Sequence, residues 1–205
     1  MPPSDSTPHT SSQQPDGQQT ATEQHHQDVR VLVKALQPGS AARRARTVVR
    51  EVLQRAGVSD DAITDAEIVV AELAANAERH GRRPYELRIF RIDGVPTWCE
   101  VVDGDPEPDK IRDAFQRLAT LPEPDLSLLA ENGRGLLLTY ELSQGHCQAY
   151  RTITTTTDSP GKAVAFALPT ASGTRLPYSA LPDLRPGLAP LRQWRLHRPI
   201  PDTQA

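Results

Sequence analysis

The sequence predicts an α/β protein of the α+β type: a two-layer sandwich with a mixed, mostly antiparallel sheet and helices on one face. Strand-like segments come in pairs joined by short turns, such as Tyr85–Ile92 and 97–102 around the turn signal Asp93-Gly94. Two long segments of helical period precede that hairpin, and a shorter one follows it. Strands joined by hairpins pair antiparallel, and helices that are segregated from them collect on one face of the sheet.

Length, charge and cysteine usage limit the class of protein. The chain has 205 residues and a formal net charge of −3, which fits one domain with appendages and gives no electrostatic reason to bind nucleic acid or an anionic membrane. No apolar run approaches the roughly 18 residues of a membrane span. Cys99 and Cys147 form no CxxC motif and fall in strand-like runs, so we expect buried free thiols. Such cysteines fit a reducing compartment, and we expect a cytoplasmic protein.

Composition divides the chain into three regions. Residues 1–28 hold almost no large apolar side chain and are expected to form a disordered N-terminal tail. Residues 29–169 carry all the periodic segments and are expected to form the folded domain. Residues 170–205 are rich in proline and show little periodicity, which predicts a flexible C-terminal tail.

The first half of the folded region predicts one strand and two helices before the hairpin. Val29–Leu36 alternates weakly and reads as an edge strand. A helix is expected over about 41–56, with its inward positions at Ala45, Val48, Val49, Val52 and Leu53. A second helix is expected over about 60–80, and Gly81 is predicted to end it in the left-handed conformation.

The second half predicts a long loop, a short helix and a second hairpin. Prolines punctuate residues 104–132, where a short helix is expected near Phe115, and a segment this long between strand and helix often serves as a lid. Gly133-Arg134-Gly135 then opens a helix that runs to about residue 142. Strands are expected over 146–154 and 163–168, with the turn between them at 159–162.

The second helix carries two candidate functional side chains. Glu72 and Asn76 lie four residues apart, so they are neighbours on one strip of the helix, beside the buried stripe. A glutamate there can act as a general base, and an asparagine can offer its carbonyl oxygen to a hard cation such as Mg²⁺. A solvated helix surface is the alternative, and the strip alone does not decide between them.

Two further clusters complement that strip. Asp103 ends a strand immediately before a turn, where a carboxylate can accept a hydrogen bond from an exocyclic amine. Gly133-Arg134-Gly135 stands at a helix N-terminus, where backbone N–H groups and the helix dipole favour phosphate. Together, an amine reader, a cation ligand, a carboxylate base and a phosphate cradle describe a site for ATP and Mg²⁺.

The order of these motifs resembles that of the GHKL ATP-binding domains of gyrase, Hsp90-type and histidine-kinase ATPases. The chain is more closely similar to the anti-sigma-factor serine kinases of actinobacteria, whose hallmarks are AELxxNAxxHG, VxDxxPxxP, GRGLxL and GKxVxFxL. The corresponding segments here read AELAANAERHG, VVDGDPEPD, GRGLLL and GKAVAFAL. The resemblance covers about residues 29–169 and implies the Bergerat ATP-binding fold.

The resemblance also implies roles for individual residues. Asn76 would hold Mg²⁺, Glu72 would take the proton of a substrate hydroxyl, and Asp103 would read the adenine amino group. His80, one turn after Asn76, would approach a phosphate, although a helix-terminal histidine is an equal alternative. Residues 104–132 would form the lid. The remaining nucleotide-binding residues would be Gly104, Gly133, Arg134, Gly135 and Leu136.

Two residues depart from the pattern of the relatives. Asn132 stands where many members have glycine, and Ala163 stands where they commonly have a threonine whose hydroxyl helps hold the adenine-binding carboxylate. The loss of that hydrogen bond would weaken nucleotide binding by about 0.5–1.5 kcal/mol.

Three functions therefore stay open. Glu72 favours a regulatory serine/threonine protein kinase of the anti-sigma or partner-switching type, with a sigma factor or an anti-sigma antagonist as partner and a homodimer as an expected assembly. The departures at Asn132 and Ala163 favour a non-catalytic ATP-binding module. A detached histidine-kinase ATPase domain is less favoured, because no helix pair carrying an acceptor histidine precedes the domain.

Overall fold

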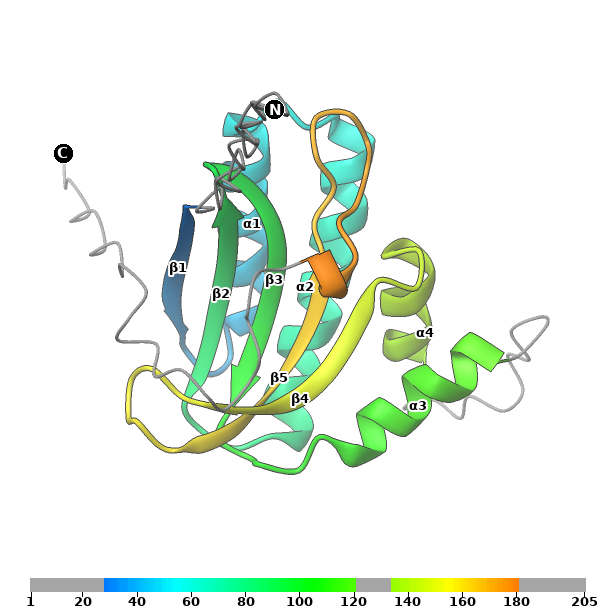
Figure 1. Ribbon diagram of the computed structural model, residues 1–205. Coiled ribbons are helices and arrows are strands. Elements are labelled where there is room, and N and C mark those ends of the chain that lie inside the picture. Colours follow the sequence, from blue (N-terminus) through cyan, green and yellow to red (C-terminus); the bar gives the residue numbers. More distant parts are fainter. Residues whose placement is uncertain (1–27, 121–133, 181–205) are drawn as a thin grey trace, which may run out of the picture.

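The computed structural model describes residues 28–120 and 134–180 (Figure 1). A five-stranded sheet runs through it in the order β1-β2-β3-β5-β4, and every neighbouring pair is antiparallel. The strands are β1 (Val29–Leu36), β2 (Tyr85–Ile92), β3 (Val95–Asp103), β4 (Cys147–Ile153) and β5 (Pro160–Ala167). The predicted α+β sandwich is confirmed, and the observed strand pairs make its sheet fully antiparallel.

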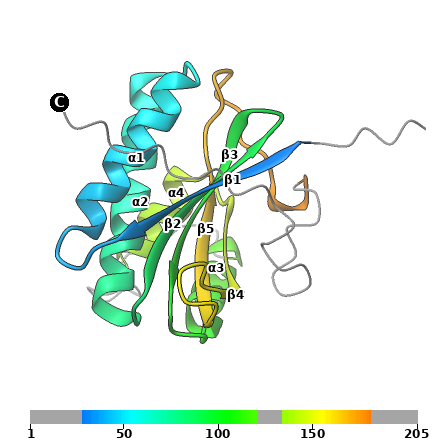
Figure 2. The same ribbon diagram turned by 90° about the vertical axis from the view of Figure 1, so that its left-hand side faces the viewer.

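The two long helices lie side by side across one face of this sheet (Figures 1 and 2). The shorter helix α4 packs on α2, and α3 borders α4 and β4. The helices are α1 (Ala41–Arg55), α2 (Asp60–His80), α3 (Asp109–Thr120) and α4 (Arg134–Leu142), and a short 3-10 helix, η2, covers Tyr178–Ala180. No helix in the described part of the chain is long and apolar enough to cross a membrane.

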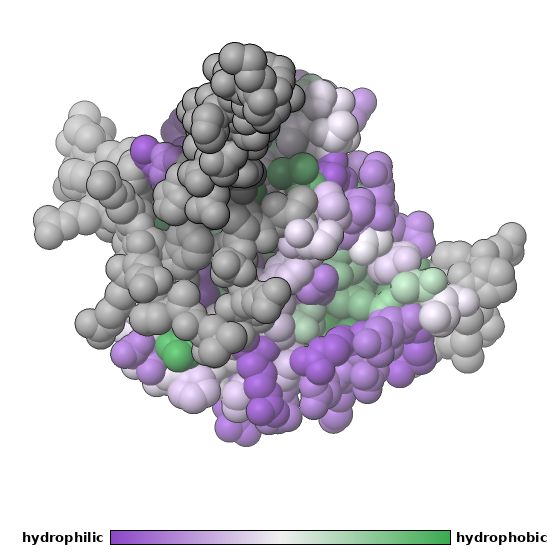
Figure 3. All heavy atoms as spheres, in the orientation of Figure 1, coloured by the Kyte–Doolittle hydropathy of each residue, from purple (hydrophilic) through white to green (hydrophobic). Residues whose placement is uncertain are grey.

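The main core lies between the sheet and the helices. Leu87 and Ile89 of β2 are fully buried on this face, as the alternation predicts. The five inward positions predicted for α1 are all buried. Phe115 and Leu118 bury the inner face of α3, and Figure 3 shows the outer face of α3 as a hydrophilic band.

A second, smaller core covers part of the opposite face of the sheet. Trp98 is buried there against Ala165 and Ala167, because the alternate residues of β3 and β5 point away from the helices. The Trp98 Nε1–H donates to the Leu176 carbonyl oxygen at 3.1 Å, and its ring meets that of Tyr178 edge-on at 5.4 Å between centroids. The start of the predicted flexible tail therefore packs on the sheet, while the domain boundary at residue 170 stays a prediction.

Of the two predicted hairpin turns, the first is confirmed and the second is wrong. Asp93 and Gly94 both adopt positive φ, 50° and 84°, which is the turn that the Asp-Gly signal predicts. The predicted turn at 159–162 is wrong, because β5 already begins at Pro160 and pairs with Ile153. The chain reverses earlier, where the Thr154 N–H donates to the Ser159 carbonyl oxygen at 2.8 Å.

Candidate functional site

The strip formed by Glu72 and Asn76 faces the start of α4. Gly135 sits so close to it that an added Cβ would lie 2.7 Å from the Glu72 Oε2 and 3.2 Å from the Asn76 Nδ2. The structure thus brings Gly135 against two residues about sixty positions earlier in the sequence, and the motifs had singled out all three. A glycine at position 135 is what permits the contact, since any side chain would displace the carboxylate or the amide.

The end of α2 comes equally close to Asp103. An added Cβ on Gly81 would lie 2.5 Å from the Asp103 Cγ. Gly81 has φ −96° and ψ −169°, so the predicted left-handed conformation is wrong. The glycine serves a close approach instead, and it leaves room for a carboxylate that is only 3% exposed.

Gly104 has a structural place beside this carboxylate. An added Cβ would lie 2.4 Å from the Arg83 carbonyl oxygen, and the Gly104 N–H donates to the Arg82 carbonyl oxygen at 2.6 Å. Gly104 therefore holds the end of β3 against the loop after α2, and it is not among the residues that line the cavity described next.

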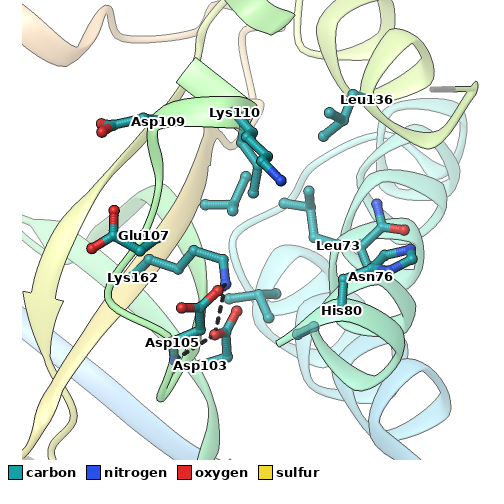
Figure 4. Close-up of a pocket in the computed structure, with 14 residues that line it drawn as sticks. Leu73, Asn76, His80, Asp103, Asp105, Glu107, Asp109, Lys110, Leu136 and Lys162 are labelled. Carbon is teal, nitrogen blue, oxygen red and sulfur yellow. Dashed lines mark hydrogen bonds and ion pairs between the residues drawn. The ribbon is translucent and has the colours of Figure 1, made fainter. Parts of the chain in front are cut away.

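A cavity of about 860 Å³ lies beside Asp103 and is bordered on the other side by residues of α2 and α4 (Figure 4). Four of the predicted site residues line it: Asn76, His80, Asp103 and Leu136. The other lining residues are Leu73, Ala77, Val101, Asp105, Glu107, Asp109, Lys110, Ile111, Lys162 and Val164. The volume falls within the range of about 300–1,000 Å³ that is usual for small-molecule sites.

The remaining predicted site residues lie beside this lining or beyond it. Glu72 and Gly135 adjoin Asn76 through the contact given above. Arg134 is the first residue of α4 and is exposed. Gly133, like Asn132 and the second half of the predicted lid, lies outside the described residues.

Sequence reasoning missed Lys162. Its Nζ lies 2.8 Å from the Asp103 Oδ1 and 2.8 Å from the Asp105 Oδ2, and Figure 4 shows all three side chains at one end of the cavity. Lys162 is directly opposite Asp103 in the β3–β5 register. A signal for it existed, because Lys162 is in phase with Val164 and Phe166 on the buried face of the strand, where an unpaired lysine is rarely found.

The predicted effect of Ala163 is wrong. Ala163 pairs with Val102 in the register, so its side chain is on the sheet face opposite to Asp103. A threonine at position 163 would therefore not reach the Asp103 carboxylate. The neighbouring position, Lys162, supplies the contact instead.

The electrostatics of this end of the cavity follow from burial and from Lys162. Burial raises the pKa of Asp103, and the hydrogen bond from Lys162 and the backbone N–H groups of Asp105 and Arg82 offset only part of the rise. The hydrogen bond from Lys162 lowers the pKa of the more exposed Asp105. Both carboxylates are thus held in place by the same ammonium group.

The residues present fit a magnesium nucleotide. Asn76 offers an amide oxygen at the cavity wall, and the N-terminus of α4 lies directly beside it. Mg²⁺ in phosphotransfer sites is commonly held by one or two protein oxygens together with the substrate's phosphates. Within residues 28–120 and 134–180, no group of three or more His, Cys, Asp or Glu side chains is placed to hold a metal by itself.

The antiparallel sheet covered by two long helices, with a cavity between a strand-end aspartate and a helical asparagine, defines the class of GHKL-type ATP-binding proteins. The chain belongs to the histidine kinase-like ATPase domain family, whose model matches residues 35–164. That membership supports ATP binding. No curated protein matches the chain in sequence.

Proposed function

We propose that this protein is an ATP- and Mg²⁺-dependent serine/threonine protein kinase of the anti-sigma or partner-switching type, which phosphorylates an antagonist protein. The observation that supports this proposal best is the position of Glu72. Its carboxylate and the amide of Asn76, the proposed metal ligand, both lie against Gly135 in the first turn of α4, where phosphate groups are favoured.

This arrangement assigns a task to each group. Asn76 Oδ1 accepts a hydrogen bond from the Arg79 Nη2 at 3.2 Å and would be the protein oxygen that holds Mg²⁺. Glu72 accepts the proton of the partner's hydroxyl while that oxygen bonds to the γ-phosphorus, and ADP leaves with the electrons of the broken P–O bond. Bound Mg²⁺ supplies charge neutralisation for the phosphates.

A non-catalytic ATP-binding module is the competing function. One of the two departures that favour it loses its force, because Ala163 points away from the site. The retained carboxylate at position 72 favours catalysis, since a module that only binds nucleotide has no need for a base beside the phosphates. Binding to a sigma factor and formation of a homodimer are part of the same proposal.

Phosphate transfer can be tested with γ-³²P-labelled ATP, Mg²⁺ and a panel of purified antagonist proteins. Glu72→Gln is expected to bind ATP within about threefold of wild type and to lower the transfer rate by about 10²–10⁴-fold, the usual contribution of a general base. Asn76→Ala should weaken binding and transfer together. Asp61→Asn, an exposed carboxylate at the start of the same helix, is the matched control.

Two outcomes would contradict the kinase proposal. In the first, wild type binds ATP but labels none of the antagonists, which leaves the non-catalytic module. In the second, Glu72→Gln labels an antagonist as fast as wild type does, which removes Glu72 from the reaction.

A further inference from the structure

Lys162 has more hydrogen-bonding capacity than its protein partners use. A lysine ammonium group carries three N–H donors. Asp103 and Asp105 take two of them, each at 2.8 Å. The third has no partner among the described residues, although Lys162 is only 5% exposed and lines the cavity. A buried donor that is left over beside a cavity is available to a ligand.

The Asp103 carboxylate has more acceptor positions than its protein partners use. A carboxylate offers about four acceptor positions. The Lys162 ammonium at 2.8 Å and the Asp105 N–H at 2.9 Å both donate to its Oδ1. The Asp103 Oδ2 therefore keeps acceptor capacity at the same end of the cavity as the spare donor of Lys162.

The charge around this pair favours a neutral ligand edge over a phosphate. Four carboxylates and two lysines line the cavity. Two of those carboxylates, Asp103 and Asp105, form ion pairs with Lys162 and neutralise its positive charge. Phosphate groups are better accommodated at the N-terminus of α4, beside Asn76.

The resemblance already assigns the adenine 6-amino group to the Asp103 carboxylate. We infer that the Lys162 Nζ reads the adjacent position of the same Watson–Crick edge by donating a hydrogen bond to N1. This inference rests on the proposed binding of ATP and makes Lys162 a specificity-determining residue. An adjacent donor and acceptor match the acceptor and donor of that edge one for one. A lysine that only neutralises the two carboxylates would not depend on N1.

The test compares the affinity of the full chain for Mg·ATP and for two analogues by calorimetry. In 1-deaza-ATP a C–H group replaces N1, and purine riboside triphosphate lacks the amino group. Wild type is expected to bind 1-deaza-ATP about 10–100-fold more weakly than ATP, the usual loss for a hydrogen bond to a charged group. Lys162→Met should bind ATP and 1-deaza-ATP equally, while it still discriminates against purine riboside triphosphate.

Lys110→Met is the matched control, since Lys110 lines the same cavity and the substitution changes the charge equally. It should keep the difference between ATP and 1-deaza-ATP. Equal affinity of wild type for these two nucleotides overturns the inference and needs no variant to fold. A difference that persists in Lys162→Met overturns it as well. If wild type binds ATP normally in either case, the proposed function survives; if wild type binds no nucleotide, both fall.

Discussion

Two buried carboxylate–cation pairs lie on opposite faces of the same sheet. On the helix face, Lys162 meets Asp103 at 2.8 Å, and on the other face Arg88 meets Glu86 at 2.8 Å. All four side chains are at most 6% exposed. What separates the two pairs is how completely their hydrogen bonds are filled by the protein itself.

In the Arg88–Glu86 pair, which we call closed, the protein itself fills the hydrogen-bonding positions of the carboxylate. Glu86 accepts from the N–H groups of Thr155 and Thr156 and from the Thr156 hydroxyl, besides Arg88. Arg88 also donates to the Ile153 carbonyl oxygen and to the Thr152 hydroxyl. The Asp103 pair keeps a donor and an acceptor free beside a cavity. A saturated pair stabilises the fold, whereas an unsaturated one can bind a ligand.

The pKa shifts of the two carboxylates have opposite directions, which agrees with this difference in hydrogen bonding. Burial alone would raise the pKa of Glu86, but the hydrogen bonds from Thr155 and Thr156 and the charge of Arg88 outweigh it, so the pKa is lowered. Burial raises the pKa of Asp103, and Lys162 and two N–H groups do not fully offset it. The donors that would complete the stabilisation of the Asp103 carboxylate are left for a ligand to supply.

The largest effect is expected from Glu86→Gln. The substitution removes the carboxylate at 2.8 Å from Arg88, which is 1% exposed, and leaves it only the more distant Glu100 at 3.8 Å among the described residues. The free energy of unfolding should fall by about 3–5 kcal/mol, as measured by urea denaturation. Glu51→Gln removes the exposed partner of Arg55 and should change it by less than about 1 kcal/mol. A loss for Glu86→Gln as small as that of the control would contradict a closed structural pair.

The next effect concerns the contact between α2 and Asp103. Gly81→Ala places a Cβ where the carboxylate now lies, so Asp103 must move and ATP affinity should fall about tenfold or more. In an Asp103→Ala background the same substitution should cost clearly less, because the clash with Asp103 is gone and only the clash with the Ala77 carbonyl oxygen, at 2.7 Å, remains. Calorimetric titration of the four proteins measures this coupling. Independent, additive losses would show that Gly81 acts elsewhere.

The smallest effect is a difference in pH dependence. The folded-state pKa of Glu86 is lowered, so its ionised form contributes stability that is present above the unfolded value near 4.5 and is lost as pH falls through the folded pKa. The folded-state pKa of Asp103 is raised, so its contribution is present below about 3.8 and is lost as pH rises through the folded pKa. As the pH is raised from 3 to 7, the free energy of unfolding of wild type should therefore increase relative to that of Glu86→Gln. Over the same range it should decrease relative to that of Asp103→Asn. The same pH dependence of the free energy of unfolding in wild type and both variants would contradict opposite roles for Glu86 and Asp103.

Local patterns predicted most of the fold. The bounds of β1 and β2, the turn at Asp93-Gly94 and the inward face of α1 were all confirmed, because alternation, helical period and turn chemistry are properties of neighbouring residues. The buried thiols of Cys99 and Cys147 were confirmed for the same reason.

The errors concern contacts between distant segments. Lys162 meets Asp103 only through the β3–β5 pairing, and the close approach of Gly81 to Asp103 depends on how α2 lies on the sheet. The predicted turn before β5 is wrong because the N–H groups of Thr155 and Thr156 donate to the Glu86 carboxylate, about seventy residues earlier, and this contact fixes the turn. No window along the sequence contains both partners of such contacts.

Calorimetric titration of Mg·ATP into wild type, Asp103→Asn and Thr156→Ala tests the central claim most directly. The claim is that the Lys162–Asp103 pair on the helix face binds the nucleotide and that the Arg88–Glu86 pair on the other face does not. Wild type and Thr156→Ala should bind ATP with the same affinity, and Asp103→Asn should bind it about 10–100-fold more weakly. The absence of binding to wild type, or equal affinity of Asp103→Asn, would contradict the claim.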